Sequence, residues 1–112
     1  MATKKITANT SVQTIATAEK HKKCKISAIT VDNQYSSAIK LTLQDIFTPD
    51  ASHGVSSPTE KTITRWVRTI GNGTAYSADQ NELADLVCLG TVKMVASATS
   101  TDCIVVVNYH WE

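Results

Sequence analysis

The stretch Ile39-Lys40-Leu41-Thr42-Leu43-Gln44 decides the fold class. Apolar and polar residues alternate in it without exception, and this period of two is typical of a β-strand with one buried and one solvent-facing side. Asp45 interrupts the pattern, and the apolar residue Ile46, followed by Phe47, then brings an apolar side chain to the opposite parity. The shift predicts a β-bulge or the end of the strand near Asp45.

Other segments share this β-pattern and are separated by turn-forming residues, of which Gly71-Asn72-Gly73 is the clearest. We expect further strands over residues 12–18, 24–31, 61–70, 89–98 and 103–111, with the last two joined as a hairpin through residues 99–102. We expect the core to contain Ile39, Leu41, Leu43, Phe47, Trp66, Val105, Val107 and Trp111.

One segment has the pattern of a helix instead. Ser77-Ala78-Asp79-Gln80 fits a helix N-cap, and Leu83, Leu86 and Val87 follow at helical spacing. The sequence therefore predicts a mainly β protein, a single antiparallel β-sandwich or jelly-roll-like domain over residues 12–112 with one short helix at about residues 78–86.

The N-terminal segment differs from the rest in charge. Residues 1–11 are polar, with Ile6 as the single large apolar residue, and predict a flexible arm. Six of the 11 basic residues lie in the first 25 positions, where Glu19 is the only acid, although the whole chain has a net charge of only +1. Two interpretations stay open: an arm or edge that meets an acidic partner or nucleic acid, or a turn and edge strand whose Lys4 and Lys5 block edge-to-edge pairing.

The composition limits the class of protein. A chain of 112 residues forms one domain, and its 16 Thr and 10 Ser favour strands with wet faces. The longest apolar run is Ile104 to Val107, far shorter than the roughly 20 residues of a membrane-spanning helix. No signal peptide is visible, so we expect synthesis and folding in a reducing cytoplasm. The near-neutral charge gives no reason to expect a nucleic-acid or membrane partner.

The three cysteines, Cys24, Cys88 and Cys103, are odd in number and widely spaced. They form neither a disulfide framework nor a paired metal motif, and each lies in an apolar or alternating segment. We expect them to be small buried residues with reduced thiols, and a single Cys88–Cys103 bridge remains the alternative.

Motifs that would carry chemistry are missing. None of His21, His53 and His110 lies in a recognisable motif, and Asp45 and Asp50 with His53 lack the spacing of a zinc or calcium site. We therefore expect no enzyme activity, no metal and no cofactor. Trp66 and Tyr76 are the one aromatic pair that could stack on a sugar, which leaves a carbohydrate- or receptor-binding module as the alternative function.

The remaining features suggest contacts between proteins. Residues 48–60 form a long loop with both prolines, and long loops are often contact-forming. Trp66 between Arg65 and Arg68 suggests a half-exposed surface. The possible contact surface comprises Lys4, Lys5, Ile6, Pro49, His53, Pro58, Arg65, Trp66 and Arg68.

The layout of the chain resembles that of small phage virion proteins, the capsid-decoration or cement proteins and related head or neck components. The resemblance rests on the run from Lys40 to Pro49, the short helix leading into Leu89-Gly90-Thr91-Val92, and the final strand ending Val107-Asn108-Tyr109-His110-Trp111. It spans about residues 24–112. It implies a non-enzymatic structural protein of the virion, with copies of itself and a capsid protein as partners, and transfers no functional residue.

Overall fold

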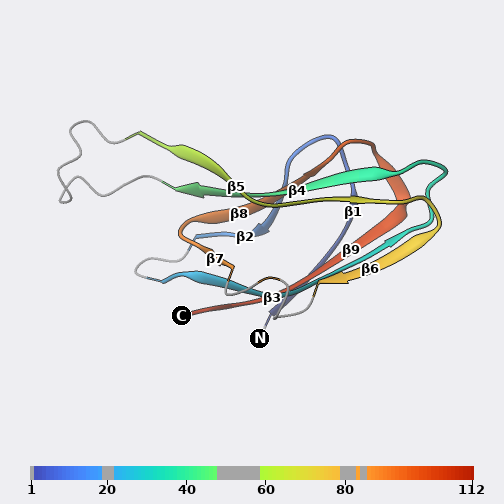
Figure 1. Cartoon of the computed structure of the whole chain (residues 1–112). Helices are drawn as coiled ribbons and strands as arrows, with labels where there is room; N and C mark the ends of the chain where they lie inside the picture. Colours follow the sequence, from blue (N-terminus) through green and yellow to red (C-terminus); the bar gives the residue numbers. More distant parts are fainter. Residues whose placement is uncertain (1, 19–21, 48–58, 79–82, 84–85) are drawn as a thin grey trace.

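The computed structural model describes residues 2–18, 22–47, 59–78, 83 and 86–112. Nine strands form within these ranges and lie in two antiparallel sheets (Figure 1). The strands are β1 (Ala2–Ala8), β2 (Gln13–Ala16), β3 (Cys24–Asn33), β4 (Ile39–Phe47), β5 (Lys61–Ile70), β6 (Thr74–Ala78), β7 (Val87–Cys88), β8 (Thr91–Ala96) and β9 (Ser100–Trp111).

The order of the strands identifies the architecture. One sheet has the order β1-β9-β3-β6, with β7 also paired to β3, and the other has the order β2-β8-β4-β5. Four antiparallel pairs are nested along the chain: β4 with β5, β3 with β6, β2 with β8 and β1 with β9. A two-layer sandwich wound from such nested pairs is a jelly roll. The predicted antiparallel, jelly-roll-like β-sandwich is therefore confirmed.

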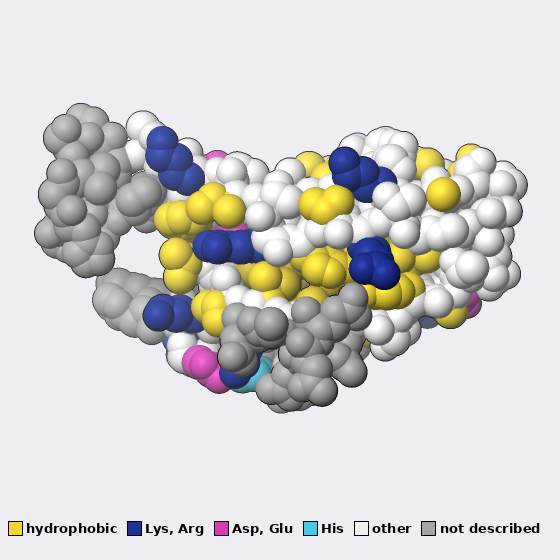
Figure 2. Space-filling view, viewed as in Figure 1, with side chains coloured by type: hydrophobic (Ala, Val, Ile, Leu, Met, Phe, Trp, Pro, Cys, Tyr) yellow, Lys and Arg dark blue, Asp and Glu magenta, His cyan; other side chains and the backbone are white. Residues whose placement is uncertain are grey.

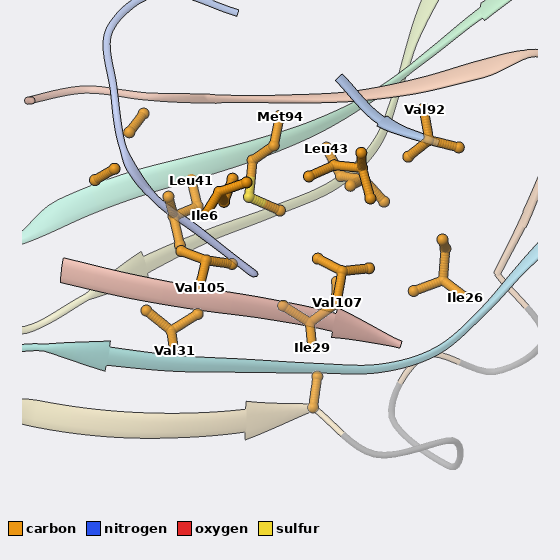
Figure 3. Packing of buried hydrophobic residues seen from close by; sticks show 14 of the residues in the cluster. Ile6, Ile26, Ile29, Val31, Leu41, Leu43, Val92, Met94, Val105 and Val107 are labelled. Carbon is orange, nitrogen blue, oxygen red and sulfur yellow. The ribbon is translucent and has the colours of Figure 1, made fainter. Parts of the chain in front are cut away.

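The core lies between the two sheets, where their alternating apolar residues meet (Figure 3). Leu41, Leu43 and Met94 come from one sheet, and Val31 and Val105 come from the other. All five are essentially inaccessible to solvent. Each such side chain contributes about 1.5–3 kcal/mol by burial, so the alternation in the sequence stabilises both layers at once.

Of the eight residues expected in the core, five are completely buried: Ile39, Leu41, Leu43, Val105 and Val107. Phe47 is only half-buried. Trp66 and Trp111 pack against the core but keep part of their surface exposed. The aromatic residues thus lie at the rim of the sandwich, and aliphatic side chains fill its centre.

The expected hairpin between residues 89–98 and 103–111 is wrong. Strand β8 pairs with β2 and β4 in one sheet, whereas β9 pairs with β1 and β3 in the other. The connection at residues 97–99 therefore crosses from one layer to the other. The local sequence indicates a turn there, but it does not show whether the chain stays in the same sheet.

The flexible arm predicted for residues 1–11 is also wrong for residues 2–8. They form β1 at the edge of a sheet, paired with β9 from Ala2 opposite Tyr109 to Ala8 opposite Ser100. Ile6 and Ala8 are buried in the core. The alternative interpretation, an edge strand that carries Lys4 and Lys5, agrees with this arrangement.

Deletion of residues 2–8 is expected to lower the free energy of unfolding by about 3 kcal/mol, because it removes the buried Ile6 and the β1–β9 pairing. For a domain of this size the loss corresponds to a melting temperature about 10 °C lower. Differential scanning calorimetry measures it, and the variant Lys4→Gln with Lys5→Gln serves as control because both side chains are exposed. An unchanged melting temperature after the deletion would show that β1 is not part of the stable sandwich.

Two further predictions depend on segments that the structure describes only in part. The predicted helix cannot begin at residue 78, because Ala78 is the last residue of β6 and is fully buried. Residues 79–82 and 84–85, which make up most of that helix, lie outside the described residues. Residues 48–58 of the long loop lie outside them as well.

The expected bulge is present, but it lies in the neighbouring strand. Strand β4 continues to Phe47, and Asp45 keeps the inward, buried position that the alternation assigns to it. In β5, Trp66 lies opposite Leu43 and Thr64 opposite Gln44, so Arg65 has no counterpart. Arg65 is therefore the additional residue of the bulge.

Candidate contact surface

The residues proposed for a contact surface lie at two different sheet edges. Lys4 and Lys5 are exposed on β1, whereas Arg65, Trp66 and Arg68 lie on β5. β1 ends one sheet, and β5 ends the other on the side of β6. Ile6 is buried and belongs to the core, so its assignment to the surface is wrong. Pro49, His53 and Pro58 lie outside the described residues.

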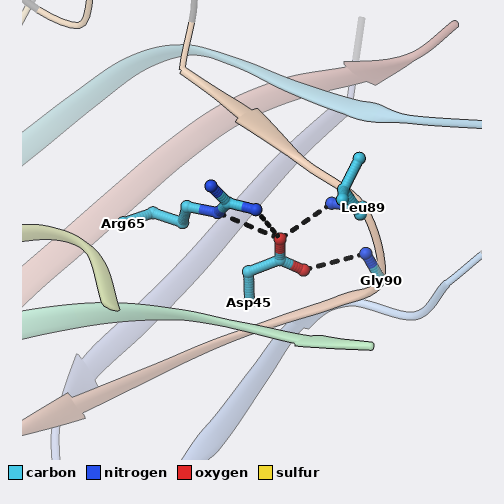
Figure 4. A network of polar contacts seen from close by, with 4 residues as sticks. All are labelled: Asp45, Arg65, Leu89 and Gly90. Atoms are coloured by element: carbon cyan, nitrogen blue, oxygen red, sulfur yellow. Dashed lines mark hydrogen bonds and ion pairs between the residues drawn. The ribbon is translucent and has the colours of Figure 1, made fainter. Parts of the chain in front are cut away.

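The best-defined polar cluster surrounds Asp45, a carboxylate with no solvent exposure (Figure 4). Arg65 donates to its Oδ2 from Nε at 3.0 Å and from Nη2 at 2.8 Å. The backbone N–H of Leu89 donates to Oδ2 at 2.9 Å, and that of Gly90 donates to Oδ1 at 2.8 Å. Four donors satisfy the buried charge, which is the condition under which a buried carboxylate is tolerated.

The bulge in β5 explains how Arg65 reaches this carboxylate. A β-bulge adds one residue to a strand and redirects its side chain. Arg65 keeps 26% of its side chain exposed and joins β5 to the buried Asp45 of β4. The apolar–polar pattern of β4 breaks at Asp45 because this buried position is filled by a charge.

Gly90 completes the cluster by allowing a close approach of two backbone segments. A Cβ atom at this position would lie 2.0 Å from the carbonyl oxygen of Ile46 and 2.7 Å from Cβ of Phe47. Any other residue would therefore push the segment before β8 away from β4. The absent side chain is what brings the N–H of Gly90 within hydrogen-bond distance of Asp45.

The aromatic pair considered for sugar stacking does not form an open platform. The guanidinium carbon of Arg68 lies 4.4 Å from the centroid of the Tyr76 ring, a cation–π contact that covers one ring face. Trp66 packs partly against the core. Arg68 and Tyr76 instead connect the edge strands β5 and β6 across the side of the sandwich.

Apolar side chains are exposed around this part of β5. Ile63 and Val67 of β5 are 38% and 45% exposed, and Leu89, next to the Asp45 cluster, is 45% exposed. Figure 2 shows hydrophobic side chains lying between Lys and Arg side chains on the face that carries β5. Arg and aromatic side chains, which β5 carries at Arg65, Trp66 and Arg68, are enriched in protein–protein interfaces, whereas Lys is depleted from them.

Sequence reasoning missed a second polar cluster, at the end of β9. Ser27 Oγ lies 3.4 Å from His110 Nδ1, and His110 Nε2 lies 2.9 Å from Glu112 Oε1. The order serine, histidine, carboxylate is that of a hydrolytic triad. The Ser27–His110 distance is at the limit of a hydrogen bond, and Glu112 is 57% exposed, so the carboxylate holds the imidazole only weakly. We interpret the cluster as a polar link between β3 and β9.

None of the three cysteines forms a disulfide, and all are buried, as expected. Cys24 and Cys88 lie directly opposite each other in the β3–β7 pairing, so Cys103 is not the neighbour of Cys88. Burial, with a smaller contribution from Asp45, raises the pKa of the Cys88 thiol to about 12. A thiol with this pKa remains protonated, and hence a poor nucleophile, at neutral pH.

The raised pKa predicts a pH dependence of stability. The folded state holds the Cys88 proton more tightly than the unfolded chain, whose thiol has the ordinary pKa of 9.0. The stabilisation is complete below pH 9 and is lost as the pH rises towards 12. Urea unfolding curves of the wild type should shift to lower midpoints over this range, more than those of Cys88→Ala. Equal shifts in both proteins would contradict the assignment.

Within the described residues, His, Cys, Asp and Glu side chains form no group of three that could hold a metal ion. No helix there is long and apolar enough to cross a bilayer. In comparisons with known proteins, no family model, curated protein or solved structure matches the chain.

Proposed function

We propose that this protein is a non-enzymatic structural subunit of a phage virion, a capsid-decoration or cement protein that acts through protein–protein contacts. Its partners in this proposal are further copies of itself and a capsid protein. It is made in the host cytoplasm and becomes part of the particle.

The observation that supports the proposal best is the nested jelly-roll pairing of the strands. Viral capsid domains use this architecture. The support is architectural, since a fold by itself serves many functions. The basic and apolar side chains exposed along β5 support the proposal as well, because they offer a contact surface for a neighbouring subunit.

The proposal is tested by adding the purified protein back to particles. Particles of the phage that encodes the chain are prepared with its gene deleted, and labelled protein is then added over a range of concentrations. A structural subunit is expected to bind to saturation at a fixed number of copies per particle. Protein that stays in the supernatant after sedimentation, or that binds without saturation, would count against the proposal.

The alternative is a carbohydrate- or receptor-binding module, since lectin domains also include jelly rolls. The half-exposed indole of Trp66 is the feature that favours it. Binding on a glycan array that is lost in Trp66→Ala but kept in Trp111→Ala would support this alternative. Absence of any glycan signal from the folded wild type would remove it.

A further inference from the structure

Cys24 and Cys88 are a pair of buried nucleophilic groups that the proposed function does not use. They lie directly opposite each other in the antiparallel pairing of β3 with β7. The side chains of two facing residues point to the same side of a sheet, and both side chains here are fully buried in the core. The two thiols therefore share one buried site between the layers of the sandwich.

The register gives these two cysteines a spacing that suits a disulfide. The backbone N–H of Ile26 donates to the carbonyl oxygen of Leu86 at 3.0 Å, so these two residues form a hydrogen-bonded pair. Hydrogen-bonded and non-hydrogen-bonded pairs alternate along a ladder, so Cys24 and Cys88, two positions further, form a hydrogen-bonded pair as well. The Cα atoms of such a pair are about 5.5 Å apart, within the range of about 4.4–6.8 Å that disulfides span. A bond between the two sulfur atoms is therefore compatible with the observed pairing.

Cys103 differs from the other two cysteines in the residue that it faces. It lies on β9 opposite Asn33, the last residue of β3, whereas Cys24 is the first residue of that strand. Its side chain is as deeply buried as those of Cys24 and Cys88. Cys103 is therefore an internal control: a thiol of the same burial that has no thiol opposite it.

The folded structure protects both thiols, so their oxidation requires β7 to open. Neither side chain is accessible to solvent, and burial raises the pKa of the Cys88 thiol to about 12, which keeps it protonated at neutral pH. β7 has only two residues and lies off the main path of its sheet, where it pairs with β3. Short segments of this kind open at a much lower free energy than the whole fold. Opening of β7 exposes Cys88, uncovers Cys24 and removes the burial that suppresses the reactivity of both thiols.

We propose that Cys24 and Cys88 form an intramolecular disulfide, which joins β7 to β3, when the protein passes from a reducing cytoplasm to an oxidising exterior. The oxidant is a low-molecular-weight disulfide such as oxidised glutathione. The thiolate of one cysteine attacks a sulfur atom of the oxidant and releases one thiol, and the thiolate of the other cysteine then attacks the mixed disulfide and releases the second thiol. The two protein thiols lose two electrons and two protons, and the oxidant takes them up as two thiols.

Formation of this bond goes beyond the proposed function and does not depend on it, because any transfer from a reducing to an oxidising compartment provides the oxidant. For a virion subunit, release from the host cell is such a transfer. The bond closes a loop of roughly 65 residues, which restricts the unfolded chain, and it fastens the shortest strand of the sandwich. The folded protein therefore becomes more stable once it has left the cytoplasm.

The test uses the purified full-length protein. The protein is prepared with its thiols reduced and is incubated with an excess of oxidised glutathione, and samples are then unfolded in iodoacetamide and analysed by mass spectrometry. Two of the three thiols are expected to disappear, with the tryptic peptides of Cys24 and Cys88 joined and Cys103 alkylated. The oxidised protein should melt about 10 °C higher than the reduced protein, and dithiothreitol should reverse this shift.

Alanine variants provide the matched comparison, because all three cysteines are fully buried. Cys103→Ala should still lose two thiols and gain the same increase in melting temperature on oxidation, whereas Cys24→Ala and Cys88→Ala should show no such increase. The peptide map of the wild type decides the outcome even if a variant does not fold. Three thiols that stay free after several days, a bridge that includes Cys103, or a final product that still carries glutathione would each overturn the inference.

The disulfide and the virion role fail in different ways. Saturable binding to particles by protein whose three thiols all stay free would refute the disulfide and leave the structural role intact. A bridge between Cys24 and Cys88 in protein that does not bind to particles would support the disulfide and refute the virion role.

Discussion

Replacement of Asp45 by asparagine is expected to lower the free energy of unfolding by about 3 kcal/mol, although the two side chains have nearly the same shape. All four groups that contact the carboxylate are donors. An asparagine amide has one oxygen, so in either orientation its NH2 group faces a donor and leaves a buried N–H without an acceptor. Urea denaturation followed by circular dichroism measures the loss.

The control for this prediction is Asp32→Asn. Asp32 is exposed and accepts a hydrogen bond from the Gln34 side chain at 2.7 Å, so its replacement should change stability by no more than about 0.5 kcal/mol. If Asp45→Asn were as mild as Asp32→Asn, the Asp45 cluster would not stabilise the sandwich.

Replacement of Gly90 by alanine is expected to destabilise the protein by about 3 kcal/mol. The new Cβ would meet the Ile46 carbonyl oxygen at 2.0 Å, and because both are backbone-attached, neither can move aside without shifting a strand. The shift would also weaken the bond from the Gly90 N–H to Asp45. The same unfolding measurement applies.

Gly71→Ala is the matched control, since a Cβ there would find its nearest neighbour at 3.4 Å, an ordinary contact. It should be close to neutral. Gly90 and Asp45 are in contact. The free energy of unfolding lost in the variant carrying both Asp45→Asn and Gly90→Ala should therefore be smaller than the sum of the losses in the two single variants. Full additivity would indicate that the two residues stabilise the fold independently.

Local pattern predicted the strands well and their pairing poorly. The alternation in residues 39–44 and in the last strand follows directly from one buried face, so β4 and β9 were recognisable. Pairing in a jelly roll joins residues far apart, such as Lys5 with Val106, and no local signal specifies it. For this reason the sequence predicts a hairpin of β8 with β9 and an N-terminal arm, whereas in the structure β8 and β9 lie in different sheets and β1 is an edge strand.

The candidate surface was predictable only in part. The sequence Arg65-Trp66-Val67-Arg68 indicated a contact strand, and the structure places it at an exposed edge. The sequence alone did not reveal the role of Asp45, because a charged residue at an inward-facing position resembles the end of a strand. Its donors lie 20 to 45 residues away in the chain, so only the folded structure brings them together.

The copy number of this protein in purified phage particles tests the proposed role as a virion subunit most directly. Particles of a phage whose genome carries the gene for this chain would be purified by density gradient, and the ratio of this protein to the major capsid protein measured by quantitative mass spectrometry. The proposal predicts a fixed ratio, reproducible between preparations, that corresponds to many copies per particle. Particles that are infectious and contain no detectable copy of the protein would contradict it.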